Sequence, residues 1–401
     1  MPSAAKSRTS AKPATRSRAK RSASPPALPS VKQIHAEAVG ALATSRVRAA
    51  ITRRLLAWYS DHARDLPWRR SRDAYRVWVS EIMLQQTVVA AVVPYFERFM
   101  ARFPSVTALA EAPEEDVLRL WEGLGYYRRA RQMHRAARVV CQEHAGEFPR
   151  DVAAVRALPG IGRYTAGAIL SIAFDDSQPI LEANTIRLFA RLTAYAGDTH
   201  STAGQRQLWN TAEQLLPSRD AGRFNQAVME LGSQICTPRN PRCDECPLAA
   251  LCPTWRYQLS DSIPAARPRP TIEEVREAAV VVRRSDKILI VRREAGERWA
   301  GLWDFPRFAL ASAADQPVER QLIDGVLKRT GMKVRPGELL TTIRHSVTRF
   351  RISLECYEAD YASKAARSKA TPEMRWVRPA ELAEVPLSTS ARKLAKLLAH
   401  E

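Results

Sequence analysis

The chain has 401 residues and carries 62 lysines and arginines against 42 aspartates and glutamates, a formal net charge of +20. A surplus of this size attracts polyanions, although charge alone separates neither DNA from RNA nor either of them from an anionic membrane. No apolar run approaches the ~20 residues that span a bilayer, and no secretory leader opens the chain. We expect a soluble protein, cytoplasmic and nucleoid-associated in a bacterium, and nuclear or mitochondrial in a eukaryote.

Residues 1–45 are the first segment in chain order. Lysine and arginine recur through its first half, serine, alanine and proline fill the gaps, and no acidic residue precedes Glu37. Such a segment buries too little apolar surface to offset the entropy lost on ordering, so it is predicted to be a disordered basic tail. The tail either adds nonspecific phosphate contacts or only keeps the protein in solution.

Residues 46–258 follow a helical pattern. Val89, Val92, Val93 and Phe96 fall at the spacing of one buried helix face, and residues 117, 120, 121 and 124 repeat that spacing. Strand-like alternation is absent from this stretch. The pattern predicts an all-α domain.

A proline-rich linker is predicted at residues 259–271, and the texture changes after it. Residues 278–282 and 288–291 are β-rich runs around a turn at Ser285, and polar and apolar residues alternate over 351–356, as on a half-buried strand. Helices are expected at 319–330 and 380–400. Residues 272–401 therefore predict an α+β domain.

Four of the six cysteines lie in one short stretch, at Cys236, Cys243, Cys246 and Cys252. Thiolates grouped in this way suit an iron–sulfur cluster or a four-cysteine zinc site, and the spacing alone favours neither metal. Disulfides are the ordinary alternative, but a chain of this length has ample core and no leader. The other two cysteines are isolated in apolar contexts and are expected to be small core residues.

The string Leu-Pro-Gly-Ile-Gly-Arg-Tyr-Thr-Ala-Gly occupies residues 158–167. Gly160 and Gly162 permit a tight turn, and the helix that follows directs free backbone N–H groups, including that of Thr165, and a positive end toward any bound phosphate. A Gly-x-Gly turn is weak support by itself, because many such turns only connect two helices.

The cysteine spacing and the glycine hairpin together resemble the endonuclease III-like superfamily of DNA glycosylases. Residues 66–69, 78–87, 121–127 and 224–227 narrow the resemblance to the adenine DNA glycosylases of that superfamily. The resemblance implies a multi-domain protein: an all-α helix-hairpin-helix glycosylase domain with a [4Fe–4S] cluster loop at 236–252, followed by an α+β Nudix-like domain. It also implies a monovalent cation at the hairpin.

The resemblance assigns the catalytic residues. Glu81 matches the acid that protonates adenine N7 and later handles the attacking water, a role that needs a pKa raised by apolar surroundings. In bifunctional relatives a lysine stands where this chain has Tyr164, and without that amine no Schiff base forms. Asn184 keeps its register in the motif. A lone glutamate in a helix is otherwise an ordinary solvated residue.

Glu182 departs from the family pattern. The family has Asp-Gly-Asn where this chain has Glu182-Ala183-Asn184, and the aspartate stabilises the positive charge that develops on the sugar. Glu182 keeps the charge but adds a methylene, on the order of 1 Å of reach, and misplacement on that scale can cost about a hundredfold in rate. Either the surroundings are repacked or activity is weakened.

Further contacts carry over by position. Gln86 and Tyr126 match residues that wedge into the duplex as a base leaves the stack. We expect the side chains that line the adenine pocket and hydrogen-bond the base to be Trp68, Arg69, Leu84 and Gln226. For each pocket residue, core packing is the alternative.

The second domain is expected to read the lesion rather than hydrolyse nucleotides. The string Gly-Leu-Trp-Asp-Phe-Pro at 301–306 resembles the entrance to a Nudix fold, but Lys328 and Arg329 occupy the positions of the paired metal carboxylates. The loop that recognises 8-oxoguanine in the family aligns with Val347, Thr348 and Arg349. Thr348 keeps a hydroxyl for the oxidised base, and Arg349 is expected to supply phosphate attraction instead of a base-specific contact.

The expected function is therefore monofunctional removal of adenine opposite 8-oxoguanine, or more weakly opposite guanine, by a monomer acting on double-stranded DNA. Two alternatives remain at this point. One is a bifunctional endonuclease III-type glycosylase/lyase, which the missing lysine disfavours. The other is a noncatalytic iron–sulfur protein that binds damaged DNA, which the departure at Glu182 motivates.

Overall fold

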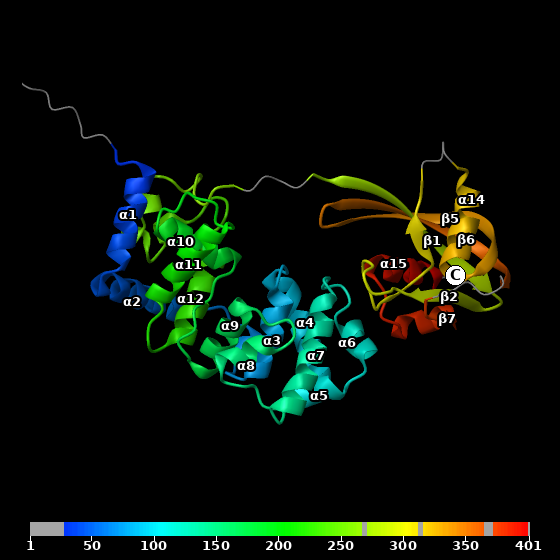
Figure 1. Cartoon of the computed structure of the whole chain (residues 1–401), viewed down its shortest axis with the longest axis horizontal. Helices are drawn as coiled ribbons and strands as arrows, with labels where there is room; N and C mark the ends of the chain where they lie inside the picture. Colours follow the sequence, from blue (N-terminus) through cyan, green and yellow to red (C-terminus); the bar gives the residue numbers. More distant parts are fainter. Residues whose placement is uncertain (1–27, 267–270, 312–315, 365–371, 400–401) are drawn as a thin grey trace, which may run out of the picture.

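The computed structural model describes residues 28–266, 271–311, 316–364 and 372–399. A helical domain and a domain built on a β-sheet lie side by side (Figure 1). The first 27 residues of the predicted tail and residues 267–270 of the predicted linker lie outside the described residues. In the part of the chain that is described, no helix is long and apolar enough to cross a membrane.

The helical domain contains two apolar cores. The first gathers residues of α3 to α9, and the second gathers residues of α1, α2, α10 to α12 and the cysteine stretch. The helices of this domain are α1 (Val31–Leu42), α2 (Ser45–His62), α3 (Ala74–Leu84), α4 (Val89–Arg102), α5 (Val106–Glu111), α6 (Glu114–Leu120), α7 (Arg128–Glu143), α8 (Val152–Ala157), α9 (Arg163–Phe174), α10 (Ala183–Leu192), α11 (Thr202–Leu215), α12 (Ala221–Gln234) and α13 (Pro253–Arg256), with short 3-10 helices η1 (Pro67–Arg69), η2 (Cys243–Glu245) and η3 (Ala249–Leu251).

The buried face predicted at residues 89–96 is confirmed in α4, where Val92 and Phe96 are fully buried. The second predicted run is helical only in part, because α6 ends at Leu120. Trp121 and Leu124 belong to the turn after it and are still buried. The apolar spacing therefore predicted correctly which residues are buried, but it did not predict that the helix ends at Leu120.

The prediction of disorder is wrong for the end of the tail, where α1 forms. The Ser30 hydroxyl oxygen caps this helix by accepting from the Gln33 N–H, and Gln33 Oε1 accepts from the Ser30 N–H. This capping box satisfies two backbone donors at the start of the helix. Ile34 and Leu42 are buried in the second core. His35 Nδ1 lies 2.6 Å from the carbonyl oxygen of Thr193, which ties α1 to the end of α10.

The C-terminal domain is a seven-stranded mixed sheet with a helix on each face. Strands run in the order β3-β2-β1-β6-β5, β4 pairs with β1, β7 pairs with β2, and β1 and β6 are parallel. Core residues on one face pack against α14 and those on the other against α15. The elements are β1 (Glu273–Arg284), β2 (Lys287–Arg292), β3 (Trp303–Asp304), β4 (Arg307–Ala309), α14 (Val318–Thr330), β5 (Met332–Val347), β6 (Phe350–Lys364), β7 (Met374–Val377), η4 (Pro379–Glu384) and α15 (Thr389–Leu398).

The structure confirms the predicted fold class, the hairpin at Ser285 and the alternation along β6. The helix predicted at 380–400 is wrong in its middle: η4 ends at Glu384, and Pro386 and Leu387 instead join Trp303 of β3. A proline has no N–H for the helical ladder, so the break falls there. Of the two isolated cysteines, Cys356 is a core residue as expected, whereas Cys141 is only half-buried.

The first residues of the predicted linker also differ from the prediction, because they pack on the helical domain. Ile263 is buried in the second core, and its carbonyl accepts a 2.9 Å hydrogen bond from Arg191. The linker boundaries otherwise stay a prediction.

Ion pairs join the two domains along α6 and the turn after it. Arg392 of α15 binds Glu122 through Nε and Nη2, at 2.7 and 2.9 Å. Trp303 Nε1 donates to Glu115, which also binds Arg375. Leu302 inserts into the first helical core. These contacts fix the sheet domain next to α6 and α7, on the side seen in Figure 1.

Candidate active site

The main cavity of the helical domain lies where the two apolar cores meet. Its volume is about 790 Å³. The lining comes from α3, α9, the start of α10 and α12, so it joins segments more than a hundred residues apart. Nine residues predicted from the sequence to form the site line this cavity together: Trp68, Arg69, Glu81, Leu84, Gln86, Tyr164, Glu182, Asn184 and Gln226.

Glu81 is a buried acid on α3, with 4% of its surface exposed. The hydroxyl of Tyr164 donates to its Oε2 at 2.5 Å. Burial raises the pKa of Glu81 to about 7, and the charge of Glu182 acts in the same direction, against the hydrogen bond from Tyr164 and the charge of Arg69. A carboxyl group with its pKa raised in this way keeps its proton to higher pH than an ordinary glutamate, which is the condition that a general acid requires.

Glu182 is the N-cap residue of α10. Its Oε1 accepts from the Thr185 N–H at 2.9 Å and its Oε2 from the Asn184 N–H at 2.9 Å, while the Thr185 hydroxyl oxygen accepts from the Glu182 N–H at 2.7 Å. Burial raises the pKa of Glu182, and the hydrogen bonds from Asn184 and Thr185 oppose it. The longer side chain folds back onto its own helix end, and it still lines the cavity.

Sequence reasoning missed Glu230, the ion that organises the floor of the cavity. Its side chain is fully buried on α12 and binds Arg64 at 2.7 Å and Arg69 at 2.8 Å. Burial alone would raise the pKa of Glu230, but the hydrogen bonds from the two arginines outweigh burial and lower the pKa to about 2. Glu230 therefore stays ionised and holds Arg69 in place. The sequence feature that could have indicated Glu230 is its position one helical turn after Gln226.

The two expected duplex wedges sit on neighbouring turns held by another residue that was missed. Gln86 and Tyr126 both have positive φ angles, 60° and 49°, and Tyr126 is 50% exposed. Arg129 donates to the carbonyls of Gln85 at 2.6 Å and of Gly125 at 3.3 Å, and its guanidinium lies over the Tyr126 ring. One side chain thus fixes both turns relative to each other.

The glycine hairpin lies at the start of α9. Gly160 has φ 81°, and a Cβ there would meet Gln132 at 2.8 Å, so glycine is needed. The first hydrogen bond of the helical ladder is Ala166 N–H to the Gly162 carbonyl, which leaves the N–H groups of 163–165 at the helix end. The side chain of Thr165 is buried and contacts Gln85, so only its backbone remains for phosphate.

Thr348 lies apart from the cavity, in the turn between β5 and β6. It has φ 52° and is exposed, and its hydroxyl donates to the Val347 carbonyl. Arg349 beside it is exposed too, with a loose 3.7 Å ion pair to Glu273. The structure thus leaves both side chains accessible and does not place them in the cavity with Glu81 and Glu182.

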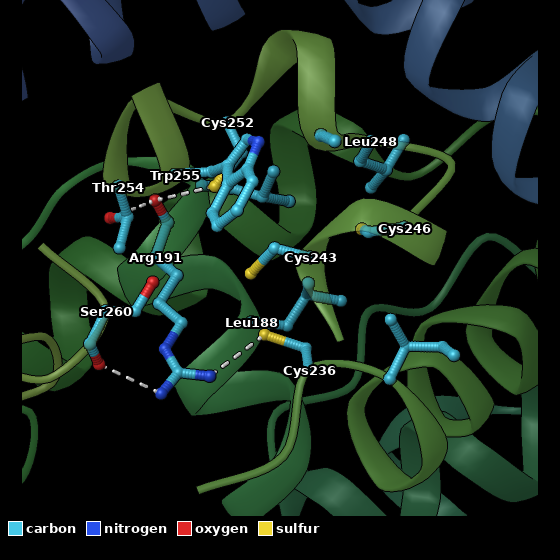
Figure 2. Close-up of a pocket in the computed structure, with 13 residues that line it drawn as sticks. Leu188, Arg191, Cys236, Cys243, Cys246, Leu248, Cys252, Thr254, Trp255 and Ser260 are labelled. Atoms are coloured by element: carbon cyan, nitrogen blue, oxygen red, sulfur yellow. Dashed lines mark hydrogen bonds between the residues drawn. The ribbon is translucent and has the colours of Figure 1, made fainter. Parts of the chain in front are cut away.

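The four clustered cysteines line one small cavity together with Leu188, Leu192 and Leu248 (Figure 2). The donor set fits an iron–sulfur cluster, because four thiols face an apolar space and Arg191 donates to Cys236 Sγ at 3.4 Å. Cys236, Cys243, Cys246 and Cys252 are the residues that would hold such a cluster.

Arg187 connects this region with the catalytic motif. This buried side chain on α10 donates to the carbonyls of Cys236 and Gly232, both at 2.6 Å, and to Asn184 Oδ1 at 3.0 Å. The cysteine loop and the catalytic end of α10 therefore share one guanidinium.

Comparisons with known proteins agree with this geometry. Residues 79–214 match the HhH-GPD superfamily of base excision DNA repair proteins, residues 236–252 the iron-sulfur binding domain of endonuclease III, and residues 278–397 the NUDIX domain. The adenine DNA glycosylase of Mus musculus is 34% identical over 86% of this chain and 76% of its own length. The chain belongs to the adenine DNA glycosylase family.

Other members of the adenine DNA glycosylase family match as well. The adenine DNA glycosylase of Mycolicibacterium smegmatis is 36% identical over 69% of this chain and 92% of its own length. A solved thermostable thymine-DNA glycosylase is 29% identical, covers 52% of this chain and 97% of its own, and superposes with a TM-score of 0.48. The family matches and the curated relatives, independently of that superposition, make the chain a DNA glycosylase of base excision repair that carries a [4Fe–4S] cluster.

Proposed function

We propose that this enzyme excises adenine paired with 8-oxoguanine, and more weakly adenine paired with guanine, and leaves an abasic site. The observation that carries the proposal is Glu81: a buried carboxyl group, hydrogen-bonded to Tyr164, on the wall of a cavity large enough for a flipped base. The protein acts on duplex DNA as a monomer.

Glu81 supplies the proton in this mechanism. Cleavage of the N-glycosidic bond leaves negative charge on the departing base, and a proton delivered to adenine N7 neutralises it. The pKa of Glu81, about 7, keeps the acid available near neutral pH. After the bond breaks, Glu81 is ionised and can accept a proton from the attacking water.

Glu182 and Asn184 act on the sugar. Positive charge develops on the deoxyribose as the base leaves, and a fixed carboxylate in a site that excludes water stabilises it. Glu182 is held by two backbone N–H groups, so its carboxylate needs little reorganisation. Arg187 orients Asn184 beside it.

Tyr164 makes the enzyme monofunctional. Strand cleavage by a bifunctional glycosylase needs an amine that forms a Schiff base. Burial and the neighbouring carboxyl groups raise the pKa of Tyr164 well above its ordinary value, so it remains a neutral hydroxyl that donates to Glu81. Borohydride should therefore trap no covalent complex with DNA, and a trapped adduct would contradict this role.

Contacts around the cavity position the DNA. Gln86 and Tyr126 fill the space of the extruded nucleotide, which lowers the cost of base flipping. The N–H groups at the start of α9, with Gly160 and Gly162, bind a backbone phosphate, together with a monovalent cation. Trp68, Arg69, Leu84 and Gln226 form the walls for the base; Trp68 also packs on Phe96 and so serves the core at the same time.

The Nudix-like domain reads the opposite base. Thr348 presents a hydroxyl for 8-oxoguanine, and Arg349 attracts phosphate without reading sequence. Hydrolysis by this domain is disfavoured because Arg329 binds Glu297 with both Nη atoms at 2.7 Å, a guanidinium where a hydrolase holds magnesium. Arg349→Ala should weaken binding to all duplexes about equally, and a selective loss for 8-oxoguanine would contradict the role of Arg349.

Thr348→Ala provides the complementary experiment. We expect it to reduce the preference for adenine:8-oxoguanine over adenine:guanine by up to about tenfold, because a typical hydrogen bond contributes about 0.5–1.5 kcal/mol. The measurement is single-turnover excision from both duplexes. An unchanged ratio would remove Thr348 from lesion recognition.

A further inference from the structure

A second cavity lies behind the active site. Its volume is about 430 Å³, and it is bounded by the end of α2, residues 63–72 and the start of α12. Four residues line both cavities: Arg64, Arg69, Ile172 and Gln226. The two spaces are therefore separated by one layer of shared residues.

Long, polar side chains make up most of this shared wall. Arg69 donates to Glu230 at 2.8 Å and its guanidinium lies 5.6 Å from the centre of the Tyr59 ring. Gln226 accepts a 3.2 Å hydrogen bond from the Tyr59 hydroxyl. To pass between the cavities, a molecule has to displace the side chains of Arg69 and Gln226, and for Arg69 this means breaking its ion pair with Glu230.

The front of the active-site cavity is the edge that carries Gln86, the residue proposed above to enter the duplex. Gln86, with its positive φ, and Val88, which is 72% exposed, lie at this edge. A flipped nucleotide that enters here stays attached to the duplex through its sugar. After the glycosidic bond breaks, the abasic sugar therefore still blocks the opening through which the base came in.

We infer that the second cavity is the exit route for the free adenine. The base passes the Arg69–Gln226 wall and leaves while the abasic DNA remains bound. The lining offers stacking surfaces at the Arg69 guanidinium and the Tyr59 ring. It also offers acceptors for the amino group of adenine at the carboxylates of Asp65, which binds Arg70, and of Asp175, which accepts from the Gly222 N–H. The inference rests on the proposed removal of adenine at Glu81.

Two tryptophan substitutions test the route without touching the catalytic groups. Ala63 and Ser71 are exposed and line only the second cavity, so Ala63→Trp, Ser71→Trp and the double variant place a bulky ring in it. Ala203→Trp, at an exposed position of α11 that lines neither cavity, is the matched control.

The experiment follows both products of one turnover. Full-length protein reacts in excess with a duplex that carries radiolabelled adenine opposite 8-oxoguanine; rapid gel filtration then separates free adenine from adenine that elutes with the protein–DNA complex. In the wild type and in Ala203→Trp we expect adenine to be lost while abasic DNA is still bound. In the filled variants we expect excision at the wild-type rate but adenine release slowed about tenfold or more.

Two results would overturn the exit route: adenine that leaves the wild-type protein only together with the DNA, or filled variants that release adenine as fast as wild type. Absence of excision in the wild type would instead refute the proposed function, so the two failures are distinguishable.

Discussion

Removing the Tyr164 hydroxyl should move the pH dependence of base excision to higher pH. The hydroxyl donates to Glu81 Oε2 at 2.5 Å in a partly buried setting, and this bond favours the ionised form of the acid. Tyr164→Phe keeps the ring and deletes the donor. Because excision needs protonated Glu81, its rate falls as pH rises through the pKa of Glu81, and that fall should begin later in the variant.

The size of the effect follows from the strength of the bond. Hydrogen bonds to charged groups contribute about 1.5–3 kcal/mol, and a change of one pH unit in a pKa corresponds to about 1.4 kcal/mol. The midpoint of the alkaline limb, near pH 7 in the wild type, should therefore rise by about one to two pH units. The absolute rate is a separate quantity, since the hydroxyl also orients the acid.

The assay is single-turnover release of adenine from pH 5 to 9, with alkali revealing the abasic sites. Tyr75→Phe is the matched control, because its hydroxyl donates to the Phe103 carbonyl in the core and contacts no catalytic group. The control should keep the wild-type midpoint. A Tyr164→Phe midpoint that stays in place or falls would refute the assignment of Glu81 as the titrating acid.

Three further predictions concern the other carboxyl group, the link to the cluster and stability. Glu182→Gln keeps the shape of the cap but removes the charge facing the sugar, so single-turnover excision should fall about 10²–10³-fold. Glu182→Asp keeps the charge and is a preferred N-cap residue, so its excision rate should fall only about tenfold. Equal rates for wild type and Glu182→Gln would contradict the role of Glu182. Arg187→Gln should lower the excision rate and the iron content together, because the carbonyls of Cys236 and Gly232 lose their buried donor. Arg206→Gln, at an exposed position, is the control and should keep both at the wild-type level. Normal iron content and activity in Arg187→Gln would contradict a role of Arg187 in connecting the cysteine stretch with the active site. As pH rises, the free energy of unfolding should fall less for Glu81→Gln than for wild type. The pKa of Glu81 is about 7 in the folded state against an ordinary 4.5, so its contribution to the free energy of unfolding falls by about 3 kcal/mol between those two pH values. Urea unfolding that gives parallel plots of this free energy against pH for the two proteins would contradict the prediction.

Much of the fold could be predicted because it depends on local patterns. The apolar spacing of α4, the alternation along β6 and the turn at Ser285 each show in a few neighbouring residues. Helix α1 was missed although its capping box, Ser30 and Gln33, is visible in the sequence, because the basic composition around it outweighed this short signal. Pro386 likewise marked the break in the last predicted helix.

The site was predicted unevenly. Motif residues such as Glu81, Tyr164 and Gln226 gather in one cavity, but Glu230 depends on Arg64 and Arg69, which lie more than 160 residues earlier. A partner so distant leaves no local pattern. The capping role of Glu182 could have been predicted from the sequence, since this residue directly precedes a helix. The contacts of Arg187 with both Cys236 and Asn184 could not, because they depend on how the cysteine stretch packs against α10.

Single-turnover adenine release from an adenine:8-oxoguanine duplex, with wild type and Glu81→Gln side by side, tests whether Glu81 is the acid that removes adenine. We expect rapid release by wild type, slower release from adenine:guanine, and none above background for Glu81→Gln. Tight binding without release by wild type, or undiminished release by Glu81→Gln, would contradict this expectation.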